Sequence, residues 1–121
     1  MSSTVLVVDD SATMRQIVAT TLQGAGWPVV SARNGRDALE AARREPIALV
    51  ITDWNMPEMN GLELIRALRA LDGYDDVPIL VLTTETDELD KNAAREAGAT
   101  GWLGKPVDAG TLTEVASALL G

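Results

Sequence analysis

The chain has 121 residues, 46% of them hydrophobic and 23% charged, with a formal net charge of −8 at pH 7. This length and composition predict one globular domain and exclude a disordered chain. The negative charge argues against direct binding of nucleic acid.

Two residue types that often hold metals, cysteine and histidine, are missing, and their absence limits the chemistry. The sequence has no cysteine and no histidine, which excludes disulfides and metal sites built from thiolate or imidazole. Any metal would therefore be held by oxygen ligands, which favours Mg²⁺ or Ca²⁺ over zinc. The first four residues lack the basic start and apolar core of a signal peptide. No apolar run approaches the about 20 residues of a membrane span, so we expect a cytoplasmic protein without a membrane segment.

Short apolar runs alternate with amphipathic stretches along the chain. The runs are predicted to be strands: Val5–Val8, Val29–Ala32, Leu49–Thr52, Ile79–Leu82 and Gly101–Leu103. Cap residues or apolar residues at helical spacing predict five helices: one after Ser11, one from Asn34, one carrying Leu62, Ile65, Leu68 and Leu71, one from about Asp87 to Ala97, and one capped by Asp108. Strand–helix alternation of this kind implies a parallel sheet with helices on both faces and right-handed crossovers. We expect residues 1–121 to form a single α/β domain with a doubly wound five-stranded parallel sheet.

Polar residues follow four of the five predicted strands. They are Asp9 and Asp10 after the first, Asp53 after the third, Thr83, Thr84 and Glu85 after the fourth, and Lys105 with Pro106 after the fifth. In open α/β sheets, ligands bind beyond the carboxyl ends of the strands. We therefore expect these side chains to gather at one edge of the sheet.

The expected gathering of carboxylates favours a metal ion. Close carboxylates repel one another and oppose ionisation, and a magnesium ion held by a few carboxylates, a carbonyl and waters relieves that repulsion. Lys105 adds a positive charge, and such a site suits phosphoryl transfer. Asp53 is the central carboxylate and the expected nucleophile, which would form an aspartyl phosphate.

Each of these residues alone has an ordinary structural explanation. Asp9 and Asp10 could cap the first helix, Thr83 could belong to a turn, and a lone Lys105 would usually be a solvated surface residue. The prediction depends on four separate strand ends supplying compatible chemistry at one edge.

The combined motifs resemble the receiver domain of two-component response regulators over essentially the whole chain. The matching residues are Asp9-Asp10, Asp53 in Asp-Trp-Asn-Met-Pro, Thr83 at the end of Ile-Leu-Val-Leu-Thr, and Lys105-Pro106. The resemblance is to single-domain members of the chemotaxis type. It implies a flavodoxin-like sheet of order 2-1-3-4-5, and a protein that assists only its own phosphorylation and dephosphorylation instead of acting as an enzyme.

The resemblance further implies a metal site and a phosphoryl donor. Asp53 would receive the phosphoryl group from a sensor histidine kinase. Asp10 and Asp53 would bind Mg²⁺ directly, Asp9 would act mainly through water, and the backbone carbonyl of Asn55 would be a further ligand. Asn55 and Glu85 also occupy positions that tune the lifetime of the phosphoryl group.

A switch is implied as well. Lys105, whose bond to Pro106 is usually cis in the family, would contact the phosphoryl group. Thr83 would move its hydroxyl toward that group, and the aromatic residue at the position of Trp102 would turn inward. The face made by the fourth helix, fifth strand and fifth helix would then be remodelled for a protein target.

Three features depart from the usual family pattern. Trp102 stands where Tyr or Phe is usual, and its larger ring would need a wider slot to be buried. Thr84 stands where a smaller residue is common and would restrict access to the phosphoryl group. Asp87 and Glu88 make the start of the fourth helix acidic, a poor match for a partner that selects basic residues there.

Two alternative functions and several pathways stay open. A phosphatase of the haloacid dehalogenase type would need an aspartate at position 55, where Asn55 cannot transfer the proton. A docking module that works without phosphorylation is opposed by the intact set of site residues. We expect a monomer that receives its phosphoryl group from a kinase of the chemotaxis type and signals by contact with another protein. The first candidate for that target is the flagellar motor switch; pilus control, a phosphate sink or a phosphorelay are also compatible.

Overall fold

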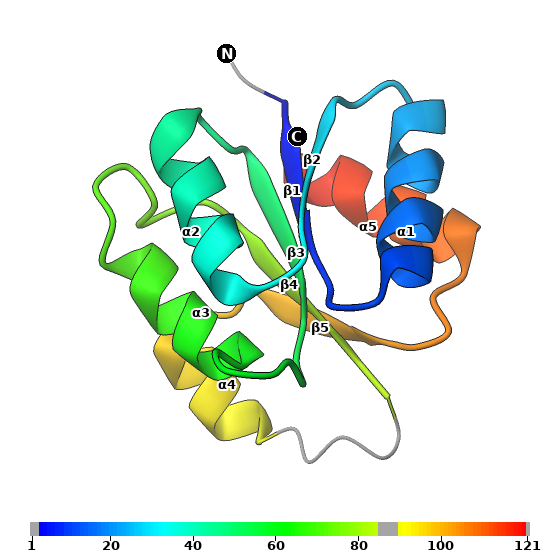
Figure 1. Ribbon diagram of the computed structural model, residues 1–121. Helices are drawn as coiled ribbons and strands as arrows, with labels where there is room; N and C mark the ends of the chain where they lie inside the picture. The colour runs from blue at the N-terminus through cyan, green and yellow to red at the C-terminus, as the bar shows by residue number, and fades with distance from the viewer. Residues whose placement is uncertain (1–2, 85–89, 121) are drawn as a thin grey trace.

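A computed structural model describes residues 3–84 and 90–120 as a five-stranded parallel sheet between two layers of helices (Figure 1). The strands are β1 (Val5–Val8), β2 (Val29–Ala32), β3 (Leu49–Asp53), β4 (Ile79–Thr83) and β5 (Gly101–Gly104). The helices are α1 (Ala12–Gly24), α2 (Gly35–Arg44), α3 (Gly61–Arg69), α4 (Lys91–Ala97) and α5 (Ala109–Leu120).

The order of the strands in the sheet is β2-β1-β3-β4-β5, and all pairs are parallel. This confirms the predicted fold class and strand order. Helices α1 and α5 cover one face of the sheet, and α2, α3 and α4 cover the other (Figure 1). No helix in the described part of the chain is both long and apolar enough to cross a membrane.

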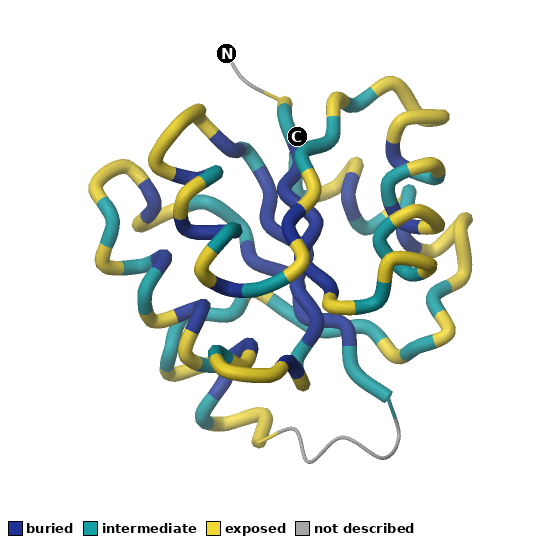
Figure 2. The backbone as a smooth tube through the Cα atoms, viewed as in Figure 1, coloured by how far each residue is buried: buried dark blue, intermediate teal, exposed yellow. Residues whose placement is uncertain are grey.

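The core has two halves, one on each face of the sheet, because side chains alternate along a strand. On β1, Leu6 and Val8 pack with residues of α2 and α3, whereas Val5 and Val7 pack with residues of α1 and α5. The central strands β1, β3 and β4 are therefore almost entirely buried, the edge strands β2 and β5 are mostly half-buried, and the outward helix surfaces are exposed (Figure 2). Buried central strands can hold their ends in a fixed register, which is what a site at the edge of the sheet requires.

The expected caps of α1 and α5 are present, and Asn34, which was expected to begin the second helix, caps α2. Backbone N–H groups of the first turns donate to Ser11 Oγ at 3.3 Å, to Asn34 Oδ1 at 2.8 Å and to Asp108 Oδ2 at 2.9 Å. The prediction for the end of α3 was wrong, since the helix ends at Arg69 and Leu71 lies beyond it. Leu71 packs on the core from the following turn, so its apolar character reflects burial and not helix.

The start of α4 differs from the sequence-based expectation within the described residues. The helix begins at Lys91, and Asp90 caps it by accepting the N–H of Ala93 at 3.0 Å. The predicted start at Asp87 lies outside the described residues, as do Glu85 and Glu88.

Arg69 connects α3, the α3–β4 loop and α4. Its guanidinium donates to the carbonyl of Gly98 at 3.2 and 2.6 Å, to that of Tyr74 at 2.6 Å and to that of Val77 at 2.7 Å. Gly98 is the C-cap of α4. The C-terminal end of α4 is therefore anchored to the body of the domain by one half-buried side chain.

Candidate functional site

The carboxyl ends of four strands bring the predicted polar residues to one edge of the sheet. Asp9 follows β1, Asp53 ends β3, Thr83 ends β4 and Lys105 follows β5. The backbone N–H of Lys105 donates to the Thr83 carbonyl at 2.7 Å, which continues the β4–β5 ladder up to the lysine. The lysine side chain is thereby placed beside the end of β3.

Three carboxylates meet at this edge. One carboxylate oxygen from each of Asp9, Asp10 and Asp53 lies within 4.8 Å of the others. Asp9 and Asp53 are buried, at 2% and 5% exposed, while Asp10 is exposed. The juxtaposition expected at the carboxyl ends of the parallel strands is therefore present.

Lys105 connects two of the three carboxylates. Its Nζ lies 2.8 Å from Asp53 Oδ1 and 3.2 Å from Asp9 Oδ2, and only 13% of its side chain is exposed. Burial alone would lower the pKa of Lys105, but the hydrogen bonds and negative charges of Asp53 and Asp9 outweigh burial and raise it. The ammonium group is therefore charged at neutral pH and fixed between the two carboxylates.

The carboxyl of Asp53 is tuned by its surroundings. Burial raises its pKa to about 6, the hydrogen bond from Lys105 opposes that rise, and the negative charge of Asp9 adds to it. Asp53 is thus mostly ionised at pH 7 yet only weakly stabilised as an anion. Such a group gains from any further positive charge placed beside it.

The oxygens of Asp53 and Asp9 differ in how fully they are occupied. Asp53 Oδ1 accepts from Lys105, while Oδ2 accepts no hydrogen bond from any residue in the ranges 3–84 and 90–120. Asp9 Oδ1 accepts from the Ser11 N–H at 2.9 Å, and Oδ2 accepts from Lys105. A carboxyl group that keeps one oxygen unoccupied and lies beside two further carboxylates fits a hard divalent cation such as Mg²⁺, which takes oxygen ligands.

Comparison with known protein families matches residues 5–117 to the response regulator receiver domain. The chain belongs to this family. It is 42% identical to the chemotaxis protein CheY homolog of Campylobacter jejuni over 118 residues, covering 96% of this chain and 91% of the relative. It is 40% identical to chemotaxis protein CheY1 of Helicobacter pylori, covering 96% and 95%.

Solved structures agree with the family assignment. The chemotaxis protein CheY4 of Vibrio cholerae superposes with a TM-score of 0.93 at 43% identity, covering 98% of this chain and 99% of that one. A response regulator of Burkholderia multivorans is 50% identical, with a TM-score of 0.81 and coverage of 100% and 97%. This receiver domain is therefore a phosphoryl-accepting signalling protein and not an enzyme, and its relatives imply an upstream kinase and a downstream partner.

The remaining predicted residues of the receiver domain lie around the carboxylates to different degrees. Thr83 is half-buried, and its hydroxyl donates to the Thr84 carbonyl at 3.3 Å. Asn55 is exposed just after β3. The bond between Lys105 and Pro106 is cis, in agreement with the expectation. Glu85 lies outside the described residues.

Trp102 lies on β5, on the α4 side of the receiver domain. The indole is half-buried, with Lys91 Nζ 5.7 Å and Arg95 Cζ 5.5 Å from the ring centroid. Both distances are within the range of cation–π attraction. Neither cation was expected from the sequence, because a ring on a strand and charges on a helix are related only by tertiary packing.

Arg15 is a second residue that sequence reasoning missed. Its Nη1 donates to the backbone carbonyl of Asp9 at 2.7 Å. Its position could have indicated a specific contact. Arg15 is the only charged residue of α1 and lies in the first turn, where a cation opposes the helix dipole.

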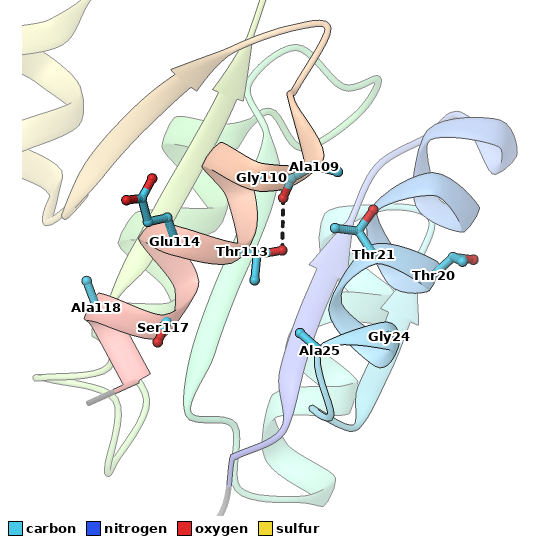
Figure 3. A pocket seen from close by; sticks show the side chains of 10 residues that line it. All are labelled: Thr20, Thr21, Gly24, Ala25, Ala109, Gly110, Thr113, Glu114, Ser117 and Ala118. Carbon is cyan, nitrogen blue, oxygen red and sulfur yellow. Dashed lines mark hydrogen bonds between the residues drawn. The ribbon is translucent and has the colours of Figure 1, made fainter.

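The groove between α1 and α5 is separate from the carboxylate edge. Its volume is about 950 Å³, and it is lined by small side chains such as Ala25, Gly110 and Ala118 (Figure 3). Thr113 in its wall donates to the Ala109 carbonyl within α5 at 2.8 Å. Glu114 is the only ionisable residue that lines the groove in the described part of the chain, so the groove offers no chemistry for phosphoryl transfer.

Proposed function

We propose that this receiver domain is a chemotaxis response regulator in which Asp53 accepts a phosphoryl group from a sensor histidine kinase, with the help of Mg²⁺. The observation that carries the proposal is that Lys105 pairs with one oxygen of Asp53, the other oxygen accepts no hydrogen bond in the described chain, and the Asp53 carboxyl group lies beside two more carboxylates. The chemotaxis assignment is supported by relatives from Campylobacter jejuni and Helicobacter pylori that carry that name.

Asp10, Asp53 and the backbone carbonyl of Asn55 would hold the magnesium ion directly. Asp9 would act through water, because Ser11 and Lys105 already donate to its two oxygens. Bound Mg²⁺ supplies positive charge that offsets the carboxylates and the oxygens of an incoming phosphoryl group. Burial is the main reason that the pKa of Asp53 is raised, so its ionised form is only weakly stabilised. The positive charge of Mg²⁺ would stabilise that ionised form.

A carboxylate oxygen of Asp53 is the proposed nucleophile. A lone pair of this oxygen forms a P–O bond as the P–N bond of the donor phosphohistidine breaks. The bonding electrons return to the imidazole nitrogen, which takes a proton from solvent. The Lys105 ammonium has three N–H donors, of which Asp53 and Asp9 use two, so the third can stabilise an oxygen of the transferred group.

The bound phosphoryl group would then act on the switch residues. A new dianion on Asp53 attracts hydroxyl and ammonium donors, and Thr83 lies at the end of the neighbouring strand. Its movement would open space for Trp102 on the next strand, so the output is a population shift between two packings. Thr84, Asn55 and Glu85 would tune access to the phosphoryl group and its lifetime.

The proposed partners follow from the family and from the charge of the chain. The donor is a kinase of the CheA type and the reader is a protein of the flagellar motor switch, which meets α4, β5 and α5. With a net charge of −8, nucleic acid is not a proposed partner. We propose that residues 1–121 act as one receiver domain, a cytoplasmic monomer without a membrane segment.

Incubation with acetyl phosphate and Mg²⁺ tests the proposal. Intact-protein mass spectrometry is expected to show one added phosphoryl group on the wild type and none on Asp53→Asn. Asp75→Asn is the matched control, because Asp75 is exposed in the α3–β4 loop, and it should be labelled like the wild type. Labelling of Asp53→Asn at the wild-type rate would show that Asp53 is not the phosphoryl acceptor. Labelling at an unchanged rate after magnesium chelation would show that Mg²⁺ is not needed for the reaction.

A further inference from the structure

Asp10 differs from the other two carboxylates in what holds it. Asp9 and Asp53 are buried and bonded to Lys105, whereas Asp10 is exposed. Its carboxylate accepts no hydrogen bond and forms no ion pair with any residue of the described ranges. It nevertheless lies within 4.8 Å of the Asp9 and Asp53 oxygens. Its position must therefore be determined by the backbone that carries it.

That backbone is held by Arg15. The guanidinium Nη1 donates to the Asp9 carbonyl oxygen at 2.7 Å. A peptide unit is planar, so this oxygen and the Cα of Asp10 belong to one rigid group of atoms. The bond from Arg15 thus limits the rotation that would swing Asp10 away from Asp9 and Asp53.

Arg15 occupies a position that the helix alone would not favour. It is the only charged residue of α1 and lies in the first turn, which contains no acidic residue. A positive charge at this end opposes the helix dipole. Arg15 forms no ion pair within the described chain, yet its side chain is only partly exposed. The carbonyl of Asp9 is thus the contact that accounts for its placement.

We propose that Arg15 is a positioning residue that fixes the Asp9–Asp10 peptide and so presents the Asp10 carboxylate to a divalent cation. The proposal rests on the proposed magnesium site. It is separable from a simple charge effect, because a guanidinium near the site repels a dication. Loss of that charge alone would tighten Mg²⁺ binding, whereas loss of the positioning bond would weaken it. The two explanations therefore predict changes of opposite sign.

Titration with Mg²⁺ alone, followed by tryptophan emission and by calorimetry, tests the proposal in the full chain. Trp54 follows Asp53 directly and supplies the optical signal. Arg15→Met is expected to weaken Mg²⁺ binding about tenfold, the typical cost of losing an outer-shell partner. Arg36→Met, which removes an exposed arginine from α2, should leave the affinity unchanged. An unchanged or tighter affinity in Arg15→Met would overturn the proposal.

Two further variants keep the test decisive. Arg15→Lys retains a donor for the carbonyl and should bind Mg²⁺ within about threefold of the wild type, clearly tighter than Arg15→Met; equal weakening of both would contradict the positioning role. In an Asp10→Asn background, Arg15→Met should have little further effect, because Arg15 acts through Asp10. A full tenfold loss in that background would also overturn the proposal. Absence of any Mg²⁺ response in the wild type would instead reject the magnesium site itself, and the role of Arg15 with it.

Discussion

The carboxylate edge and the α4–β5 face of this receiver domain are held together by different kinds of contact. At the edge, Lys105 bonds to Asp53 and Asp9 at 2.8 and 3.2 Å, with its side chain 13% exposed. On the face, a half-buried Trp102 is contacted by two exposed cations at 5.7 and 5.5 Å. Charge pairs shielded from water resist displacement more than exposed cation–π contacts do. The carboxylate edge is thus held firmly, while the α4–β5 face can be rearranged at little cost in free energy.

The two cations on the face are also in local conflict. Lys91 and Arg95 are four residues apart on α4, and like charges at this spacing destabilise a helix. The indole of Trp102, which both cations approach, offsets the repulsion. If Trp102 leaves its place, that compensation is lost, so the packing of α4 and the position of Trp102 are coupled.

The largest expected effect concerns the one firm anchor of the face, Arg69. Arg69→Met would leave the carbonyls of Gly98, Tyr74 and Val77 without their guanidinium donor. Each orphaned carbonyl costs about 1–3 kcal/mol, so we expect the free energy of unfolding to fall by about 4 kcal/mol in urea denaturation. Arg66→Met, an exposed position on the same helix, should change it by less than about 0.5 kcal/mol. Equal effects of the two variants would mean that α4 is not anchored at its C-terminal end.

A smaller effect tests the cost of ionising the buried Asp53 carboxyl at the carboxylate edge. The pKa of Asp53 is about 6 in the fold, raised mainly by burial, against about 3.9 in an unfolded chain. Between these values the folded protein binds more protons than the unfolded chain. Without Mg²⁺, the contribution of Asp53 to the free energy of unfolding therefore falls as pH rises from 4 to 6, by about 3 kcal/mol, and stays low above pH 6.

Asp53→Asn should remove this pH dependence and stabilise the metal-free protein near pH 7. Urea denaturation at pH 4.5 and pH 7 in the presence of a chelator measures the difference, with Asp75→Asn as the control. If Asp53→Asn keeps the wild-type pH dependence, ionisation of Asp53 does not destabilise the metal-free fold.

The smallest effect is expected on the face itself. The double variant Lys91→Gln with Arg95→Gln loses two cation–π contacts, worth about 0.5–1 kcal/mol each when exposed, and gains relief of about 0.2–0.5 kcal/mol from the like charges. The net loss of unfolding free energy should be about 1 kcal/mol, with a red shift of the Trp102 emission. Arg43→Gln on α2 is an exposed control. A loss well above about 2 kcal/mol would show that the face is as firmly held as the edge, and the contrast would fail.

Local chemistry is what made much of this receiver domain predictable. Runs such as Val5–Val8 report burial on both faces of a sheet, and Ser11, Asn34 and Asp108 are side chains that cap helices wherever they precede one. Strand alternation then implied that Asp9, Asp53 and Lys105 share an edge, because parallel strands deliver their carboxyl ends to the same side. Leu71 was misplaced because an apolar residue in a turn carries the same signal as one in a helix.

The amino-acid sequence by itself determined the α/β fold and the set of residues at the carboxylate edge, since these depend on periodicity and on motifs along the chain, and the resemblance of those motifs to the receiver domain implied the strand order. Only the tertiary structure decided that Lys105 occupies one oxygen of Asp53, that Arg15 holds the Asp9 carbonyl, and that Lys91 and Arg95 share the ring of Trp102. These contacts join residues through side-chain direction and burial. Neither quantity is fixed until the helices are packed on the sheet.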